Sequence, residues 1–348
     1  MALISALLAA MSLLTSWASA QTPLRGPYFV NASSTSAWVC WRWTAQSPDA
    51  CKELGPLTPG AEIKYGISSS SAEWTARTLP AQGAPIRFAA IGDSGDGGSA
   101  QLQVARVLTR WDPDFVIHTG DIVYPSGKDK HYDARFFHPY RTLLAKVPLF
   151  PSLGNHDYGY AFLKRPSQRT YAKNYKRIFR RPKYYTFNAG PAQFFSLDTN
   201  KEGASIKPAA SVLPGSRQYR WLKRELAAST AAWKIVFLHV PVYTAKDHGD
   251  HETVREALEP LFTRYGVDIV FQGHNHYYER TSPRKGVTYV TTGTGGSGLY
   301  STGGKRPWSN ALLSEYGFVA VALDDKKLTL DMVDVSGRIL DHHIIPHR

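Results

Sequence analysis

The feature that most constrains this chain is a repeated arrangement in which a short apolar run ends at a glycine or histidine and polar residues follow. Apolar runs of roughly four to eight residues between turn residues are typical of buried strands. In an open α/β sheet the carboxyl ends of parallel strands line one crevice, so we expect the polar residues after these runs to converge. The five segments are IRFAAIGDSG, DFVIHTGDIVY, VPLFPSLGNHD, KIVFLH and VDIVFQGHNH.

Stretches with helical periodicity separate several of these runs. Apolar residues three or four positions apart form one face of a helix, and a helix between two buried strands predicts a βαβ unit with parallel strands. Pro260 falls inside the last such stretch, where we expect it to disturb the helix. The three apolar faces comprise Val104, Val107, Leu108 and Trp111; Tyr219, Leu222 and Leu226; and Val254, Leu258, Leu261 and Tyr265.

The C-terminal part of the chain has a different sequence pattern. The segments YVTTG, FVAVAL, LTLDMV and RILDHHII are short and rich in β-branched residues. Such segments predict strands, and we expect these to be antiparallel, with a turn at Ser336 and Gly337.

The N-terminal part predicts a separate, small β domain. From about residue 24 to 84 the chain contains short alternating segments such as SAWVCWRW and AEIKYG. Stretches of turn and linker residues, SSSSAEW and LPAQGAP among them, separate or follow these segments. We therefore expect an antiparallel sandwich over residues 21–84 and a second, larger α/β domain over residues 85–348.

The first twenty residues are typical of an export signal. They carry no charged side chain, are mostly apolar, and end in Ala18, Ser19 and Ala20, a small-x-small pattern. We expect cleavage after Ala20 and a secreted or periplasmic protein, with an uncleaved anchor as the alternative. No later segment of the sequence predicts a membrane span.

Export makes the cysteine content informative. Cys40 and Cys51 are the only cysteines of the chain, and an oxidising compartment favours a disulfide between them. Two separate buried thiols are the alternative.

The formal net charge of +13 favours anionic partners. An anionic substrate, an anionic envelope and nucleic acid are all compatible with this charge. The most basic stretch, Lys164 to Tyr185, contains no acidic residue. It is read equally well as a solvated surface or as a rim that attracts substrate.

The polar groups at the predicted strand ends form a mixed oxygen and nitrogen donor set. Carboxylate, amide, imidazole and phenol ligands without thiolate suit iron, manganese or zinc. The set is too large for one ion, but two ions that share a carboxylate, ~3.5–4 Å apart, would use it. His274 and His276 are two positions apart, so both face one side of an extended segment and each can serve a different ion. The donors are Asp93, Asp121, Tyr124, Asn155, His239, His274 and His276.

The ordered motifs GDSG, GDIVY, GNHD, a strand ending in His239, and GHNH resemble those of the metallophosphoesterase superfamily. The tyrosine of GDIVY and the YER that follows GHNHY resemble purple acid phosphatases in particular. The resemblance covers residues 85 to 345. It implies an α/β fold, a metallophosphoesterase-type αββα sandwich, preceded by a small all-β sandwich that is similar to a fibronectin-like domain.

The resemblance also assigns roles to the donors. It implies that Asp93, Asp121, Tyr124 and His276 hold Fe(III), and that Asp121 bridges to a second ion. Asn155, His239 and His274 would complete the site of that second ion, which is Fe(II), Zn(II) or Mn(II).

Two further histidines correspond to residues that contact substrate in this family. His156 would contact the phosphate and assist the leaving group, and His248 would be the second substrate histidine. The match of His248 is looser, because some members have two adjacent histidines where this chain has His248 and His251. Asp157, next to His156, either holds the ring of that histidine in one tautomer or caps a turn.

The predicted function is an exported binuclear-metal phosphatase that hydrolyses phosphate monoesters by attack of a metal-bound hydroxide. The partner is a small phosphate ester; the sequence does not determine the oligomeric state. The alternative is a phosphodiesterase or nuclease with the same dimetal centre, for which nucleic acid would be a substrate. Readings from another class are an iron-dependent redox protein and an envelope-binding protein with a structural metal site.

Several other polar residues favour structural interpretations. His118 lies within an apolar run and is expected to be a hydrogen-bonded core histidine. Arg280 is expected to pack behind the site, with a phosphate contact as the alternative. The glycine-rich run from Thr292 to Gly304 either borders the substrate or is a loop without contacts. The histidines near the C-terminus, His342, His343 and His347, are expected at the surface.

Overall fold

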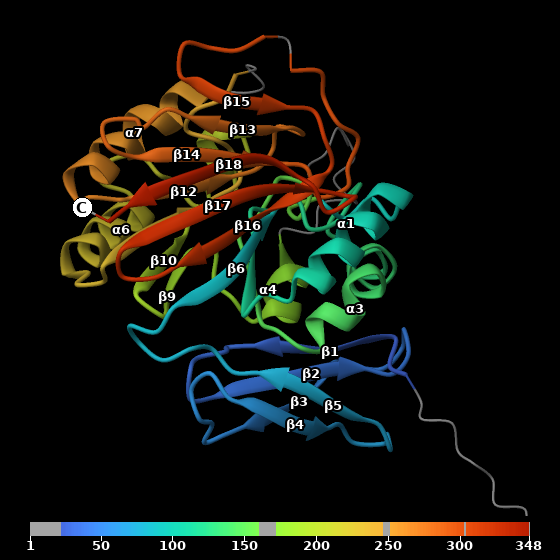
Figure 1. Cartoon of the computed structure of the whole chain (residues 1–348). Helices are drawn as coiled ribbons and strands as arrows, with labels where there is room; N and C mark the ends of the chain where they lie inside the picture. The colour runs from blue at the N-terminus through green and yellow to red at the C-terminus, as the bar shows by residue number, and fades with distance from the viewer. Residues whose placement is uncertain (1–21, 160–171, 246–250, 303, 348) are drawn as a thin grey trace, which may run out of the picture.

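The chain folds into two facing β-sheets with helices on both outer sides, and five N-terminal strands lie beneath this assembly (Figure 1). The computed structural model describes residues 22–159, 172–245, 251–302 and 304–347. The proposed signal segment, residues 1–20, and His248 lie outside the described residues. No described helix combines the length and the apolar character that a bilayer span requires.

The first sheet has six strands in the order β18-β17-β16-β6-β7-β8. The last three run parallel to one another, whereas the C-terminal strands pair antiparallel, as expected from the sequence. The strands are β6 (Ile86–Ile91), β7 (Phe115–His118), β8 (Leu149–Pro151), β16 (Gly317–Leu323), β17 (Lys327–Asp334) and β18 (Ile339–Pro346).

The second sheet has seven strands in the order β15-β13-β14-β12-β11-β10-β9. Its centre is parallel, from β10 through β11 and β12 to β14. The expectation that the YVTTG segment forms a purely antiparallel strand is wrong, because β14 lies between parallel β12 and antiparallel β13. The strands are β9 (Tyr185–Ala189), β10 (Ala192–Ser196), β11 (Trp233–Phe237), β12 (Ile269–Gln272), β13 (Tyr278–Thr281), β14 (Thr288–Thr292) and β15 (Ser309–Leu313).

Helices cover the outer face of each sheet. The three predicted amphipathic helices are confirmed as α1, α6 and α7. Pro260 lies inside α7 but does not end it, because its neighbours Ala257, Leu258 and Leu261 are buried in the core under the second sheet. The helices are α1 (Ser99–Trp111), α2 (Asp129–Tyr132), the π-helix η1 (Asp133–Phe137), α3 (His138–Leu144), α4 (Lys173–Phe179), α5 (Asn200–Gly203), α6 (Arg217–Ala228) and α7 (His251–Arg264).

Alternation along the strands creates three apolar layers. In β6, Phe88 and Ala90 belong to the cluster between the sheets, while Ala89 and Ile91 belong to the cluster under α1 and α3. A strand directs successive side chains to opposite faces, so one short apolar run supplies two cores. The third cluster lies under α6 and α7 and includes Phe262. The predicted αββα sandwich is therefore confirmed.

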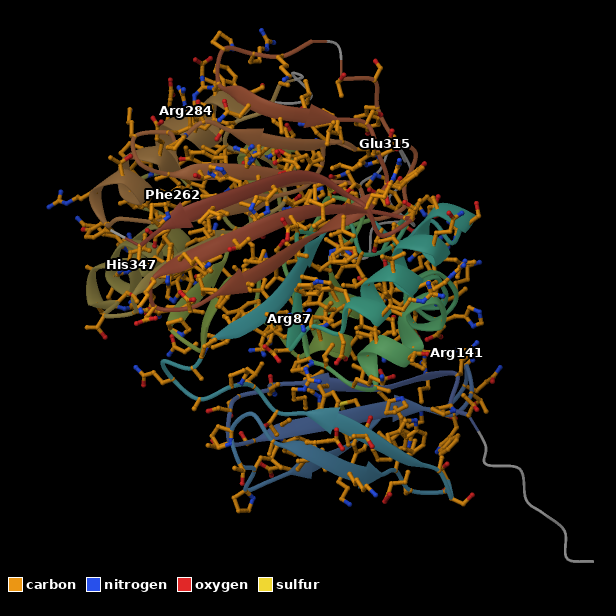
Figure 2. The ribbon with its side chains drawn as sticks, in the orientation of Figure 1. Arg87, Arg141, Phe262, Arg284, Glu315 and His347 are labelled. Carbon is orange, nitrogen blue, oxygen red and sulfur yellow. A yellow bond between two sulfur atoms is a disulfide. The ribbon has the colours of Figure 1, made fainter. Side chains whose placement is uncertain are left out.

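Figure 2 draws the side chains on the ribbon, with Phe262 of α7 and Arg87 of β6 among those labelled. Phe262 is fully buried, whereas Arg87, Arg141 and Glu315 are exposed.

Five N-terminal strands form two antiparallel pieces, a sheet β1-β2-β3 and a hairpin β4-β5. β5 begins inside the SSSSAEW stretch that was expected to be a turn. The disulfide between Cys40 and Cys51 is confirmed, and it joins directly paired residues of β2 and β3. Apolar residues of these strands, such as Trp41, belong to the same apolar cluster as Phe88, so the domain boundary at residue 84 stays a prediction. The strands are β1 (Arg25–Val30), β2 (Ala37–Arg42), β3 (Ala50–Leu54), β4 (Glu62–Gly66) and β5 (Glu73–Arg77).

An ion pair connects the two large sheets beyond the GHNH motif. Arg280 of β13 donates two hydrogen bonds to Asp341 of β18, at 2.7 and 2.9 Å, and the Tyr278 hydroxyl donates a third at 2.7 Å. The side chains of Arg280 and Asp341 are only 9% and 13% exposed. Arg280 is therefore a structural residue of the sandwich, and the alternative of a phosphate contact is wrong.

Removing the acidic partner of this pair should destabilise the fold. We expect Asp341→Ala to lower the free energy of unfolding by about 3–5 kcal/mol, because it leaves a buried guanidinium without its carboxylate. The matched control is Asp331→Ala on the same hairpin, which breaks the exposed pair with His342 and should cost ~0–1 kcal/mol. Urea unfolding measures both values. Equal losses in the two variants would contradict the assignment.

Candidate metal centre

The polar strand ends converge at the carboxyl edges of the two parallel strand groups. Asp93 follows β6, Asp121 follows β7 and His274 follows β12, and these three residues adopt left-handed backbone conformations with φ of 55°, 52° and 69°. Residues other than glycine rarely adopt such angles, and they persist where the surrounding structure enforces them. The backbone thus turns sharply at the ends of three strands and directs the side chains toward a common point.

Glycines permit the close approach of these loops. A Cβ on Gly154 would collide with the carboxylate of Asp121, and a Cβ on Gly120 would lie 2.8 Å from Nδ1 of His239. The glycines in the GDIVY and GNHD motifs are therefore required by contact between loops.

One group of donors comes from Asp93, Tyr124 and His276. The Tyr124 hydroxyl donates to Oδ1 of Asp93 at 3.0 Å and lies 3.1 Å from Nε2 of His276. That nitrogen is 3.4 Å from Oδ1 of Asp93. The three side chains are at least nine-tenths buried.

A second group comes from Asn155, His239 and His274. Oδ1 of Asn155 lies 3.0 Å from Nε2 of His239 and 3.1 Å from Nδ1 of His274. The two imidazole nitrogens are 3.3 Å apart. Edges of this length match the spacing of donors around a cation held at ~2.0–2.2 Å.

Asp121 lies between the two groups. Its Oδ2 is 3.4 Å from Nε2 of His239, and its Oδ1 accepts a hydrogen bond from the backbone nitrogen of His156 at 2.8 Å. Ligand atoms of Asp93, Asp121 and His239 all lie within 4.8 Å of one another. The structure thus brings together all seven predicted donors, with the predicted bridging carboxylate in the middle.

Backbone carbonyls determine the tautomers of two histidines. The Thr119 carbonyl accepts from Nδ1 of His239 at 2.9 Å, and the Gly298 carbonyl accepts from Nδ1 of His276 at 2.8 Å. In the neutral rings Nε2 therefore carries a lone pair. In the second group, this lone pair of His239 faces the carbonyl oxygen of Asn155, another acceptor. Acceptors at this distance repel each other unless a proton or a cation lies between them, so the donor set fits a metal ion.

The electrostatics of the site also favour a positive charge. Burial would lower the pKa of His239, but the neighbouring Asp121 carboxylate raises it to about 9. Burial and the charges of Asp121 and Asp93 raise the pKa of Tyr124 well above its ordinary value. A phenolate at Tyr124 therefore requires a compensating cation beside it.

His156 lies at the edge of this cluster. The Pro125 carbonyl accepts a hydrogen bond from Nδ1 of His156 at 3.0 Å, and Nε2 lies 3.8 Å from Oδ2 of Asp121. The ring packs against Tyr124 with centroids 4.3 Å apart. Its Nε2 edge is directed toward the donor cluster, while the opposite edge is held by the backbone.

The described hydrogen bonds of Asp157 favour the turn-capping interpretation, and the Pro125 carbonyl holds Nδ1 of His156. The Asp157 carboxylate accepts hydrogen bonds from the backbone nitrogens of Gly154 and Ile122, at 2.9 and 3.3 Å, and from the Tyr132 hydroxyl at 3.2 Å. Asp157 thus joins the GNHD and GDIVY loops to each other and to α2.

Tyr300 is a residue of the site that the sequence did not single out. Its ring stacks on His276 with centroids 4.3 Å apart and planes 17° apart, and its backbone nitrogen donates to the His276 carbonyl at 2.9 Å. The described part of the Thr292–Gly304 run therefore borders the site, through Tyr300. The only signal in the sequence was one aromatic residue among glycines and small residues.

The other polar residues follow the structural interpretations. His118 is fully buried between Ser94 and Gly120, at 2.9 and 3.2 Å, and burial lowers its pKa to about 3. His342 and His347 are exposed. His343 is half-buried rather than fully exposed.

The geometry agrees with comparisons to known proteins. Residues 86–278 match the profile of the Calcineurin-like phosphoesterase family. The chain is 29% identical over 266 residues to "Probable purple acid phosphatase 20" of Arabidopsis thaliana, covering 70% of this chain and 60% of that protein. It is 27% identical over 300 residues to human "Tartrate-resistant acid phosphatase type 5", covering 76% of this chain and 91% of that protein.

A solved structure shows the same fold. The purple acid phosphatase PPD1 from yellow lupin (Lupinus luteus) seeds superposes with a TM-score of 0.73 at 18% identity, covering 92% of this chain and 74% of that one. The resemblance to purple acid phosphatases that the motifs predicted is thereby confirmed. The match to the family profile runs from the first residue of β6 to the first residue of β13, which is more than half of the chain. The protein therefore belongs to the calcineurin-like phosphoesterase family.

Proposed function

We propose that the protein is an exported acid phosphatase that hydrolyses phosphate monoesters at a binuclear metal centre. The observation that carries this proposal is the pair of donor groups on either side of Asp121, in which oxygen and nitrogen donor atoms converge at 3.0 to 3.4 Å from one another. The kinship with purple and tartrate-resistant acid phosphatases supports the same reaction class. Export rests on the sequence of residues 1–20.

The donor chemistry suggests which residues would hold each ion. Asp93, Tyr124 and His276 would hold Fe(III), because a phenolate ligand suits a hard trivalent ion. Asn155, His239 and His274 would hold Fe(II), Zn(II) or Mn(II), and Asp121 would contact both ions. When bound, the ions would supply positive charge for the phosphate oxygens and would acidify water.

His156 is the residue proposed to handle the leaving group. With Nδ1 held by the Pro125 carbonyl, a proton added to this ring resides on Nε2, on the side that faces the donor cluster. A proton at that atom can pass to the ester oxygen as the P–O bond breaks. His248 is proposed to contact the phosphate from the segment outside the described residues.

The positive surface charge favours anionic substrates, and these include phosphodiesters as well as phosphate monoesters. Lys173, Lys176 and Arg180 are exposed on and after α4. A cationic surface of this kind is the observation in favour of a phosphodiesterase or nuclease.

Metal removal tests the centre directly. We expect exhaustive chelation to abolish hydrolysis of an aryl phosphate, with a loss of at least ~10³-fold, because water and phosphate lose their electrophilic partners. Adding Fe, Zn or Mn back should restore turnover, and metal analysis should find two ions per chain. Undiminished turnover in metal-free protein would exclude the proposal.

Substitution of His156 tests the leaving-group role. We expect His156→Ala to lower kcat by about 10²–10⁴-fold, since general acid catalysis contributes that much. Metal content should stay at the wild-type level. The control is His342→Ala, which removes an exposed histidine of β18 that is not among the proposed site residues, and this variant should retain full activity. Near-wild-type kcat in His156→Ala would reject the role.

Paired substrates decide between monoester and diester hydrolysis. We expect kcat/KM for a mono-aryl phosphate to exceed that for the bis-aryl phosphate, because a dianionic ester gains more from two cations. The same preparation and the same metals serve for both assays. A strong preference for the diester would instead support the phosphodiesterase alternative.

A further inference from the structure

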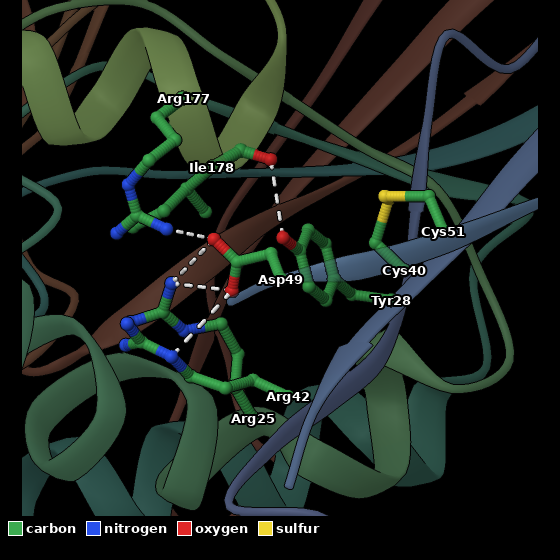
Figure 3. Close-up of a disulfide and its surroundings, with 8 residues drawn as sticks. All are labelled: Arg25, Tyr28, Cys40, Arg42, Asp49, Cys51, Arg177 and Ile178. Carbon is green, nitrogen blue, oxygen red and sulfur yellow. Dashed lines mark hydrogen bonds and ion pairs between the residues drawn. A yellow bond between two sulfur atoms is a disulfide. The ribbon is translucent and has the colours of Figure 1, made fainter. Parts of the chain in front are cut away.

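A cluster of six charged side chains, with a buried core and an exposed edge at Arg177, lies where the N-terminal strands meet the rest of the fold, and we call it the arginine–aspartate cluster. Figure 3 shows three of its arginines around one aspartate, close to the Cys40–Cys51 disulfide. Positive and negative groups are equal in number, so the cluster is neutral. Its members are Arg25, Arg42, Arg177, Asp49, Asp129 and Asp133.

Arg25 of β1 is the centre of this cluster. Its side chain is 0% exposed and binds three carboxylates, each through a different nitrogen. Nε lies 2.6 Å from Asp133, Nη2 lies 2.6 Å from Asp129, and Nη1 lies 3.0 Å from Asp49. Only the planar guanidinium fork can satisfy three acceptors in this way.

Two of these carboxylates belong to one short helical segment. Asp129 and Asp133 lie on α2 and η1, whereas Asp49 lies just before β3. Arg42 of β2 adds a contact of 2.6 Å to Asp129. Burial alone would raise the pKa of Asp129, but hydrogen bonds from Arg25 and Arg42 lower it. Two arginines of the N-terminal strands, Arg25 and Arg42, therefore form ion pairs with the α2–η1 segment, residues 129–137.

The same segment touches the metal centre from its other side. The Tyr132 hydroxyl donates to Oδ1 of Asp157 at 3.2 Å, and Nη1 of Arg135 donates to the carbonyl of Tyr124 at 2.9 Å. Tyr132 is fully buried. Tyr124 supplies a proposed metal ligand, and Asp157 holds the loop that carries Asn155 and His156.

We propose that Arg25 is a positioning residue for the metal centre and that the N-terminal sheet sets the geometry of the site through it. Arg25 acts on Asp129 and Asp133, these residues place Tyr132 and Arg135, and those two side chains hold the loops of Tyr124 and Asp157. The inference deepens the proposed function and rests on it, since it concerns how that site is held.

A second arginine of the N-terminal strands provides a comparison. Arg77 of β5 also reaches two aspartates of the α/β part, Asp112 at 2.8 Å and Asp114 at 3.3 Å. These aspartates lie between the end of α1 and the start of β7, at the amino end of the strand and so opposite the site. Loss of Arg77 weakens the docking of the N-terminal strands without touching the α2–η1 segment.

The experiment compares Arg25→Met with Arg77→Met in the full-length protein. Turnover of an aryl phosphate is measured on metal-loaded protein, well below the Tm of each variant, and Zn²⁺ binding is measured by calorimetry on metal-stripped protein. We expect Arg25→Met to lower kcat about 10–100-fold and to weaken Zn²⁺ binding about tenfold, as displaced supporting groups do. Arg77→Met should change neither value by more than about twofold, although both variants lower the Tm.

A double-mutant cycle tests whether Arg25 acts on the metal centre through Tyr132. Tyr132→Phe removes only the hydroxyl that reaches Asp157. If Arg25 acts through Tyr132, the loss in kcat for the double variant should be smaller than the product of the two single losses. If Arg25→Met does not fold, Arg25→Lys takes its place, because it keeps the charge and loses the three-way fork.

The outcomes separate this inference from the proposed function. Equal kcat and Zn²⁺ affinity in folded Arg25→Met, or its replacement, and in Arg77→Met would overturn the positioning role. Multiplicative losses in the cycle would overturn the route through Tyr132. A wild-type chain that binds Zn²⁺ without hydrolysing phosphate esters would overturn the proposed function, while the Zn²⁺ affinities would still decide the role of Arg25.

Discussion

The structure depends on a concentration of electron-rich atoms that needs a positive charge at its centre. Buried carboxylates, imidazole nitrogens and an amide oxygen lie 3.0 to 3.4 Å apart around Asp121. Without a cation or an added proton such an arrangement is unfavourable, because buried acceptors repel one another and have lost their water. The rest of the fold supplies the rigidity that keeps these groups together, through three left-handed residues at strand ends and one apolar layer on each side of each sheet.

The αββα architecture explains why this site lies where two sheets meet. The parallel strands β6, β7 and β8 bring Asp93, Asp121 and Asn155 from one sheet, and β11 and β12 bring His239 and His274 from the other. Neither sheet alone provides a complete set for two ions. Packing between the sheets therefore contributes directly to the geometry of the candidate centre, and the apolar cluster between them supports the site as well as the fold.

Support for the proposed ligands comes mostly from the backbone and from distant residues. Carbonyls of Thr119, Pro125 and Gly298 orient three imidazoles. Asp157 connects two loops, and the proposed action of Arg25 extends this support to the N-terminal strands. Such groups determine how ligands are held, and they commonly affect metal affinity and activity nearly as much as the ligands.

The sequence by itself determined the fold class and the polar side chains that gather at the strand ends, because strand ends and glycine turns are local features that a short segment specifies. It did not reveal the carbonyl that orients His156, the stacking of Tyr300, the parallel pairing of β14 or the arginine–aspartate cluster. Each of these involves partners far apart in the chain; Arg25 and Asp133, for example, are separated by 108 positions. Only tertiary packing brings such groups within hydrogen-bonding distance, since no local pattern encodes which of many distant partners a side chain will meet.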